Sequence, residues 1–95
     1  MTYKVVFADR ALKELKGLDG YISIMILAWI RRNLEGSSNP RQKGKELTAG
    51  HSVQWLYHTG EYRLPAEIQQ DGATVLLLDI RHRKDIYKAL GGIKT

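Results

Sequence analysis

Two short turn signals divide the second half of this chain into three strand-like segments. Thr59-Gly60-Glu61 separates residues 53–57 from residues 62–69, and Gln70-Asp71-Gly72 separates the latter from residues 73–80. Asp-Gly is a dipeptide typical of tight hairpin turns, and strands joined by such turns pair antiparallel. The pattern therefore predicts a three-stranded antiparallel meander. Its last strand is the most apolar, which predicts a central position in the sheet.

The first half of the chain has the pattern of one strand followed by two helices. Residues 3–7 have two adjacent valines at their centre, and β-branched residues favour strands. Asp9 stands where an N-cap would precede a helix ending near Gly17, and Asp19 stands in the same way before a helix over residues 20–35. The predicted order is β-α-α-β-β-β. The predicted fold class is α+β, with an antiparallel sheet packed against two N-terminal helices and a short C-terminal helix.

The segments between and after these elements complete the predicted organisation. Pro40 ends the second helix, because proline cannot continue a helix interior. Residues 41–48 are basic, contain one glycine and predict a loop, and residues 85–90 predict the short C-terminal helix. A length of 95 residues predicts a single domain that spans residues 1–95.

The second predicted helix is apolar over more than one face. Helical spacing predicts a core stripe, but Ile24 and Leu27 fall outside it. One interpretation is a helix packed between the sheet and the first helix; the other is an apolar face that a partner protein covers. The residues of the stripe are Ile22, Met25, Ile26, Trp29, Ile30 and Leu34.

Composition excludes several classes of protein. The chain has no cysteine, so it has neither a disulfide framework nor a thiolate metal site, which fits a reducing cytoplasm. Its longest apolar run, residues 24–30, is much shorter than the roughly 20 residues of a membrane span, and the three histidines lack metal-ligand spacing. The formal net charge of +5 favours an anionic partner. We therefore expect a cytoplasmic protein with no membrane, metal or cofactor requirement.

Strand alternation predicts one polar face on the meander. Gln54, His58, Arg63 and Arg81 fall on the face away from the helices. Pro65 shares that face and predicts an edge strand or a bulge, because it lacks a backbone N–H. Converging cations suit a nucleic-acid backbone, but an open sheet face is also polar simply because it meets solvent. The residues predicted to face the core on the middle strand are Tyr62, Leu64, Ala66 and Ile68.

Three segments carry a resemblance to a known family. Residues 43–48 read Lys-Gly-Lys-Glu-Leu-Thr, residues 55–63 read Trp-Leu-Tyr-His-Thr-Gly-Glu-Tyr-Arg, and residues 82–87 read His-Arg-Lys-Asp-Ile-Tyr. With the order of elements, these segments resemble the RelE/ParE superfamily, the toxin halves of bacterial toxin–antitoxin pairs, over almost the whole chain. The resemblance is closest to RelE-type toxins, which commonly read Trp-Arg-Tyr-Arg-x-Gly-x-Tyr-Arg and Gly-His-Arg-x-x-Ile/Val-Tyr.

The resemblance implies a metal-independent endoribonuclease that cleaves mRNA in the ribosomal A site. In that reaction the 2′-hydroxyl of the target nucleotide attacks the adjacent phosphate, and cations stabilise the developing charge. Arg63 and Tyr87 match two of the family's catalytic positions, and Arg83 matches a third, with Arg81 as its competitor. Tyr87 has two interpretations: a residue that stacks on the base or moves a proton, and an aromatic anchor of the last helix. The residues expected to contact RNA are Lys43, Lys45, Gln54 and Lys84.

The chain departs from the family pattern at two positions before the hairpin turn. Leu56 and His58 stand where RelE-type toxins commonly carry arginines, and Arg81 replaces the glycine before His-Arg. His58 is a candidate general base, since histidine titrates near neutral pH, or alternatively an inert surface residue. A ParE-like inhibitor of DNA gyrase without nuclease activity therefore stays open, as does a degenerate toxin that acts only as antitoxin partner and co-repressor.

The resemblance also implies partners. The expected partner is a cognate, RelB-like antitoxin with a flexible segment that folds on binding. Ile24 and Leu27 are the expected antitoxin contacts, because they are the surplus apolar residues of the second helix. The ribosome and mRNA are the expected targets, and the toxin–antitoxin complex is expected to bind operator DNA.

Overall fold

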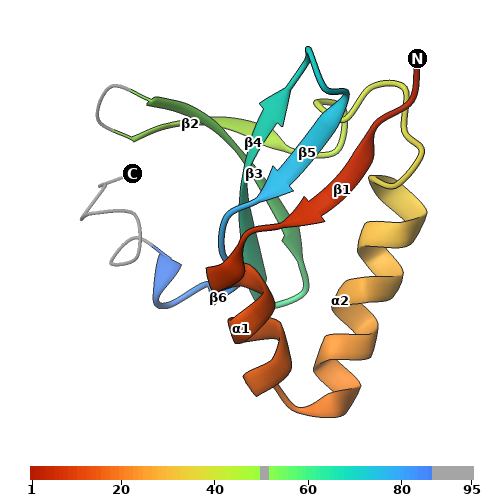
Figure 1. The fold of residues 1–95 in the computed structure, drawn as a ribbon. Helices are drawn as coiled ribbons and strands as arrows, with labels where there is room; N and C mark the ends of the chain where they lie inside the picture. The colour runs from red at the N-terminus through yellow and green to blue at the C-terminus, as the bar shows by residue number, and fades with distance from the viewer. Residues whose placement is uncertain (50–51, 87–95) are drawn as a thin grey trace.

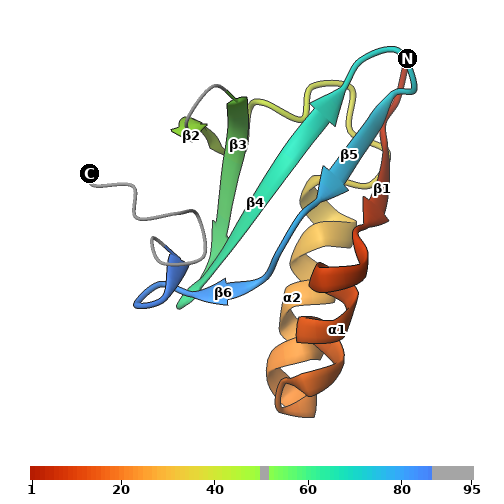
Figure 2. The same ribbon diagram turned by 60° about the vertical axis from the view of Figure 1, so that its left-hand side comes forward.

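A mixed sheet with two helices on one of its faces forms the protein (Figures 1 and 2). The computed structural model describes residues 1–49 and 52–86. The strands lie in the order β1-β5-β4-β3-β2, and β6 pairs with β4. Along the chain the elements are β1 (Lys4–Phe7), α1 (Asp9–Gly17), α2 (Gly20–Asn33), β2 (Lys45–Ala49), β3 (Ser52–Thr59), β4 (Tyr62–Gln69), β5 (Thr74–Leu77) and β6 (Arg81–His82).

The α+β class, the two N-terminal helices and the antiparallel meander are confirmed. β3 pairs with β4 and β4 with β5, both antiparallel. The sheet as a whole is not antiparallel, however, because β1 pairs with β5 in parallel, with Lys4 opposite Thr74. The two helices return the chain to the end of the sheet from which β1 started. β5 is an inner strand, but β4 holds the middle of the order.

The segment predicted as a basic loop contains a strand. Residues 45–49 form β2, which pairs antiparallel with β3 and places Lys45 opposite Leu56. The prediction was wrong because β2 is the outermost strand of its side of the sheet. Such a strand is polar wherever it meets solvent, so its composition resembles that of a loop. The predicted helical turn over residues 85–90 lies almost wholly outside the described residues.

The helix caps agree with the prediction at one helix and differ by one residue at the other. Asp19 is the N-cap of α2, and its carboxylate accepts a hydrogen bond from the Tyr21 N–H at 2.9 Å. At α1 the N-cap is Ala8, and its side chain makes no capping bond. Asp9 is instead the first helical residue, where its negative charge lies at the positive end of the helix dipole.

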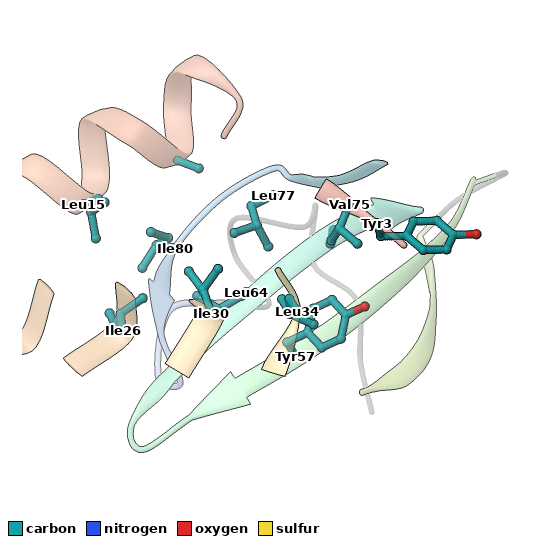
Figure 3. Close-up of a cluster of buried hydrophobic side chains, with 12 residues drawn as sticks. Tyr3, Leu15, Ile26, Ile30, Leu34, Tyr57, Leu64, Val75, Leu77 and Ile80 are labelled. Carbon is teal, nitrogen blue, oxygen red and sulfur yellow. The ribbon is translucent and has the colours of Figure 1, made fainter. Parts of the chain in front are cut away.

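The main core lies between the helices and the inner strands (Figure 3). Tyr57, Leu64 and Leu77 are completely buried there, as strand alternation requires. Burying each such leucine contributes about 1.5–3 kcal/mol. Met25 is an exception to the predicted stripe, because it is 52% exposed. A second, smaller cluster lies on the other face of the sheet and consists of Leu47, Leu56 and Ile86.

Pro65 lies in an inner strand and not at an edge. β4 pairs with β6 through residues 62–63 and with β5 through residues 66–69. Pro65 falls between these two ladders, where its C=O accepts a hydrogen bond from the Leu78 N–H at 2.8 Å. The missing N–H of Pro65 therefore falls at the gap between β5 and β6, where β4 has no paired strand on that side.

None of the helices in residues 1–49 and 52–86 has the length and apolar character required to cross a membrane.

A buried carboxylate ties α1 to the segment after β5. Asp79 accepts hydrogen bonds from the Ile80 N–H at 2.8 Å and from Arg81 Nε at 3.0 Å. Arg10 of α1 reaches the same carboxylate at 3.3 Å. Because the Asp79 side chain is 8% exposed, these partners replace water around its charge.

We expect Asp79→Asn to lower the free energy of unfolding by about 1–3 kcal/mol, because the substitution leaves two arginines without their anionic partner. Urea unfolding followed by circular dichroism measures the difference. Asp71→Asn, in an exposed turn, is the matched control and should stay within about 0.5 kcal/mol of wild type. Equal stability of Asp79→Asn and wild type would contradict a structural role for this carboxylate.

Candidate nucleic-acid interface

A shallow pocket lies on the sheet face opposite the helices. Its volume is about 280 Å³. β3 and β4 provide its floor and one wall, and the first residue of β2 with the two residues before it provides the other wall. The residues that line it are Lys43, Gly44, Lys45, Leu56, His58 and Arg63. Three cations and one histidine, all of them among the sequence-predicted site residues, therefore meet at one hollow.

The pairing of β3 with β4 brings His58 and Arg63 together. These two residues stand directly opposite each other, one on each side of the hairpin turn. Side chains that face each other across an antiparallel pair share a face of the sheet, so the prediction that they lie on one face is confirmed. Leu56 lies on the same face, but Leu47 and Ile86 bury it. It is therefore an apolar floor for the pocket and not an exposed residue on an open surface.

Arg63 is held in place by the hairpin turn. Its Nη1 donates hydrogen bonds to the backbone carbonyls of Gly60, at 3.1 Å, and Tyr62, at 3.2 Å. Gly60 adopts a φ of 57°, a left-handed conformation that glycine accommodates without strain. The turn thus orients one end of the guanidinium, and Arg63 has no acidic partner within the described residues.

Arg81 stands beside Arg63 in the strand register but does not line the pocket. β6 places the two arginines opposite each other. The Arg81 guanidinium, however, binds Asp79 at 3.0 Å and Glu14 of α1 at 3.7 Å. The hydrogen bond to Asp79 raises the pKa of Arg81. The expected convergence of Arg81 with the other cations is therefore not seen, because two carboxylates draw its side chain toward α1.

Arg83 and Lys84 also lie away from the pocket lining. Arg83 Nε contacts the Glu61 carboxylate at 2.7 Å, and the Arg83 N–H donates to the Glu61 carbonyl at 2.7 Å. Lys84 is exposed, and its N–H donates to His82 Nδ1 at 3.2 Å. The structure thus fixes Arg83 to the hairpin turn. Tyr87, the remaining sequence-predicted catalytic residue, lies outside the described residues.

Gln54 is separated from the cationic pocket. It lines a second hollow of about 200 Å³, together with Arg41, Glu46, Trp55 and Ile68. Its Oε1 is buried and accepts no hydrogen bond from the described part of the chain. Sequence alternation grouped Gln54 with His58. The two residues are four positions apart along β3, however, and they line different hollows.

The sequence reasoning missed the contacts that β3 aromatics make with the segment before β2. The Tyr57 hydroxyl donates to the Pro40 carbonyl, and Trp55 Nε1 donates to the Arg41 carbonyl at 3.2 Å. The Arg41 guanidinium lies 6.0 Å from the centre of the Trp55 ring. A tryptophan and a tyrosine two residues apart, following a loop that contains proline, were the only sequence signal of this contact.

A metal site is not evident in residues 1–49 and 52–86, where no group of three or more histidine, aspartate or glutamate side chains could hold an ion. The pocket is a cationic hollow with one imidazole side chain. Such a site can bind a phosphate group and move a proton.

Comparison with known proteins defines the class. The sequence profile described as "ParE toxin of type II toxin-antitoxin system, parDE" matches residues 5–87. The chain belongs to this family, and it is a toxin of a type II toxin–antitoxin module within the RelE/ParE superfamily.

Among individual proteins, the chain is 31% identical over 88 residues to Toxin RelG of Mycobacterium tuberculosis, covering 93% of this chain and 99% of that protein. It is also similar to a toxin–antitoxin complex structure, RelBE2 of M. tuberculosis, with 27% identity, a TM-score of 0.77 and coverage of 90% and 95% of the two chains. The intact E. coli RelBE complex shares the fold, with 20% identity, a TM-score of 0.67 and coverage of 85% and 96%.

We expect stability at alkaline pH to depend on Tyr57. Burial raises the pKa of the Tyr57 phenol to about 12, although the nearby Arg41 charge lowers it. Between pH 10 and pH 12 the unfolded chain releases this proton while the folded chain keeps it, so the free energy of unfolding falls as the pH rises. From pH 9 to pH 11 this decline should be smaller by about 1 kcal/mol in Tyr57→Phe than in wild type.

Urea unfolding of the two proteins at both pH values measures this difference. Tyr3→Phe is the control, because it removes a hydroxyl from another buried tyrosine and leaves Tyr57 in place. Its free energy of unfolding should still show the decline that Tyr57 contributes. A decline of the same size in Tyr57→Phe and wild type would show that the Tyr57 phenol titrates alike in both states.

Proposed function

We propose that this toxin is a ribosome-dependent endoribonuclease that cleaves mRNA in the A site and is neutralised by a RelB-like antitoxin. The observation that carries the proposal is the cationic pocket, in which Lys43, Lys45, His58 and Arg63 line one hollow of about 280 Å³. The membership of the chain in the RelE/ParE superfamily supports it.

The pocket suits a reaction in which negative charge accumulates on a phosphate. In the proposed reaction the 2′-hydroxyl oxygen of the target nucleotide forms a bond to the adjacent phosphorus, and the bond to the 5′-oxygen breaks. Arg63 binds the phosphoryl oxygens through the guanidinium nitrogens that the turn does not use. Lys43 and Lys45 add positive charge from the other wall. Donors that are held in place before the reaction stabilise this charge with little reorganisation.

His58 is the proton-transfer group in this proposal. It takes the proton of the 2′-hydroxyl, because an imidazole nitrogen can act as a general base. It is exposed and stands opposite Arg63, so a phosphate bound to Arg63 lies beside the imidazole. The leaving 5′-oxygen also requires a proton. The resemblance gives that role, or stacking on the base, to Tyr87.

A second candidate is favoured by two observations. The family that matches is described as ParE, and the guanidinium groups of Arg81 and Arg83 are paired with carboxylates. Fewer available cations suit a ParE-like inhibitor of DNA gyrase better than a nuclease. If the available cations support neither activity, the chain is a degenerate toxin that only binds its antitoxin and represses transcription at operator DNA.

We expect Arg63→Ala to lower the rate of mRNA cleavage at least about 100-fold, because the substitution removes a phosphate ligand that the turn orients. Primer extension on a reporter mRNA in a purified translation system measures the cleavage. Arg32→Ala is the matched control, since Arg32 is an exposed arginine of α2 outside the pocket, and it should cleave at the wild-type rate.

The same assay separates the candidates. Undiminished cleavage by Arg63→Ala would contradict the assignment of the pocket. Intact mRNA with the wild-type protein would contradict the nuclease proposal, and inhibition of gyrase supercoiling in a parallel reaction would then select the ParE-like function. If the protein neither cleaves mRNA nor inhibits gyrase but still binds its antitoxin, it is a degenerate toxin.

The outer face of α2 is the proposed antitoxin contact. Ile24 is 66% exposed and Leu27 is 36% exposed. Tyr21 and Met25 of the same helix are exposed as well, so together they form an apolar surface on a basic protein. Such surfaces mark protein interaction sites. An amphipathic, acidic antitoxin segment that folds on binding would cover it.

We expect Ile24→Glu to weaken binding of the cognate antitoxin about tenfold or more, because a carboxylate would be buried against an apolar segment. Isothermal titration calorimetry measures the dissociation constant. Ser38→Glu adds the same charge at an exposed position outside α2 and should bind normally. If both variants bind as tightly as wild type, α2 is not the contact.

A further inference from the structure

The lysines of the pocket are carried by a segment that crosses from one side of the sheet to the other. Pro40 and Arg41 lie on the side of Trp55 and Tyr57, which belong to the helix face. Lys43 and Lys45 line the pocket on the opposite side. The chain therefore passes across the edge of β3, beside residues 55–57, within residues 40–45, which we call the crossover. Residues 40–44 belong to no helix or strand, so the position of the crossover depends on its contacts with β3.

Two hydrogen bonds fasten the start of the crossover to β3. The Tyr57 hydroxyl donates to the Pro40 carbonyl from a completely buried side chain, and Trp55 Nε1 donates to the Arg41 carbonyl at 3.2 Å. Pro40 is itself buried. Because a buried hydroxyl without a partner would be unfavourable, Tyr57 specifies the position of this carbonyl.

Gly44 fixes the end of the crossover, between the two lysines. A Cβ placed on Gly44 would stand 2.7 Å from the Leu56 carbonyl oxygen, 2.7 Å from Trp55 Cδ1 and 2.8 Å from Tyr57 Cδ1. Real Cβ atoms essentially never approach other heavy atoms this closely. One of the three neighbours is backbone of an inner strand, so relief must come from movement of the crossover. Only glycine permits the observed approach.

We propose that Gly44, with Tyr57 and Trp55, forms a seat for the crossover and acts as a set of positioning residues for Lys43 and Lys45. None of the three is proposed to touch RNA. Each acts through the lysines, because a crossover displaced from β3 carries both ammonium groups away from Arg63. The proposal about RNA rests on the proposed function, whereas the seat itself is a property of the fold.

The first experiment measures binding of a single-stranded RNA that cannot be cleaved, an oligonucleotide with 2′-O-methyl groups, by fluorescence anisotropy at several salt concentrations. We expect Gly44→Ala to bind about tenfold more weakly. The negative slope of log K against log salt should become shallower by about 1.4, since each of two lost phosphate contacts on a single strand accounts for about 0.7. Gly17→Ala is the matched control, because a Cβ there meets no atom within 4 Å, and it should bind as wild type does.

A cycle of variants separates positioning from general loss of structure. In a Lys43→Ala/Lys45→Ala background, Gly44→Ala should cause no further loss of affinity, because its effect passes through the lysines. Tyr57→Phe, which loses only the hydroxyl, should shift affinity in the same direction by a smaller factor, and Tyr3→Phe should not. Full additivity of Gly44→Ala with the lysine substitutions, or wild-type affinity and salt slope in Gly44→Ala, would overturn the proposal.

The second experiment tests the seat without RNA. In the wild-type protein we expect nuclear Overhauser contacts from a Gly44 Hα to Trp55 Hδ1 and to the Tyr57 ring, and in Gly44→Ala we expect amide shifts to change at Lys43, Lys45 and His58. Absence of these contacts in wild type, or unchanged amides in Gly44→Ala, would overturn the seat. If the contacts are present but wild type binds no free RNA, the positioning role toward RNA fails while the seat stands, and the cleavage assay on ribosomes decides the proposed function separately.

Discussion

The register between β3 and β4 is the constraint on which the rest of this structure depends. It places Tyr57 opposite Leu64 and His58 opposite Arg63. The first pair lies in the main core and the second lines the pocket. Because side chains alternate between faces, a slip of one residue would move the core pair into solvent and the pocket pair into the core. Burial of Tyr57 and Leu64 therefore fixes the geometry of the site on the opposite face.

The distribution of charge divides the cations near the site into two groups. Arg81 and Arg83 are held by carboxylates, from Asp79 and Glu14 in one case and from Glu61 in the other. Among the described residues, Lys43, Lys45 and Arg63 form no ion pair. The paired arginines fasten the segment after β5 to α1 and to the hairpin turn. The remaining cations give the pocket its positive charge, so the structural and the proposed chemical roles fall on different residues.

The sequence predicted the elements that depend on local chemistry and missed the contacts between distant segments. The Thr59-Gly60 turn and strand alternation were sufficient to place His58 and Arg63 on one face. The parallel pairing of β1 with β5 was not predictable, because it joins residues about 70 positions apart that carry no mutual signal. β2 was missed for a local reason, because an outer strand with polar residues resembles a loop in sequence.

The site was predicted only in part for the same reason. Neighbouring positions on paired strands are readable from alternation, and four of the pocket residues were obtained in this way or from the resemblance. Arg81 binds Asp79, two residues before it, and also Glu14 on α1, whereas Arg83 binds Glu61 on the turn. The contacts with Glu14 and Glu61 depend on tertiary packing. Leu56 looked like a defect on an RNA-binding face, yet it belongs to the apolar cluster with Leu47 and Ile86. A buried role of this kind is invisible until the packing is known.

A structure of the wild-type toxin on a ribosome, with a 2′-O-methyl mRNA in the A site, would test the role of the pocket. We expect the phosphate that follows the modified nucleotide to lie within hydrogen-bonding distance of Arg63, with Lys43 and Lys45 on its other side and His58 near the 2′-oxygen. A phosphate held elsewhere on the protein, with the pocket filled only by solvent, would contradict the proposal that this pocket is the site of RNA cleavage.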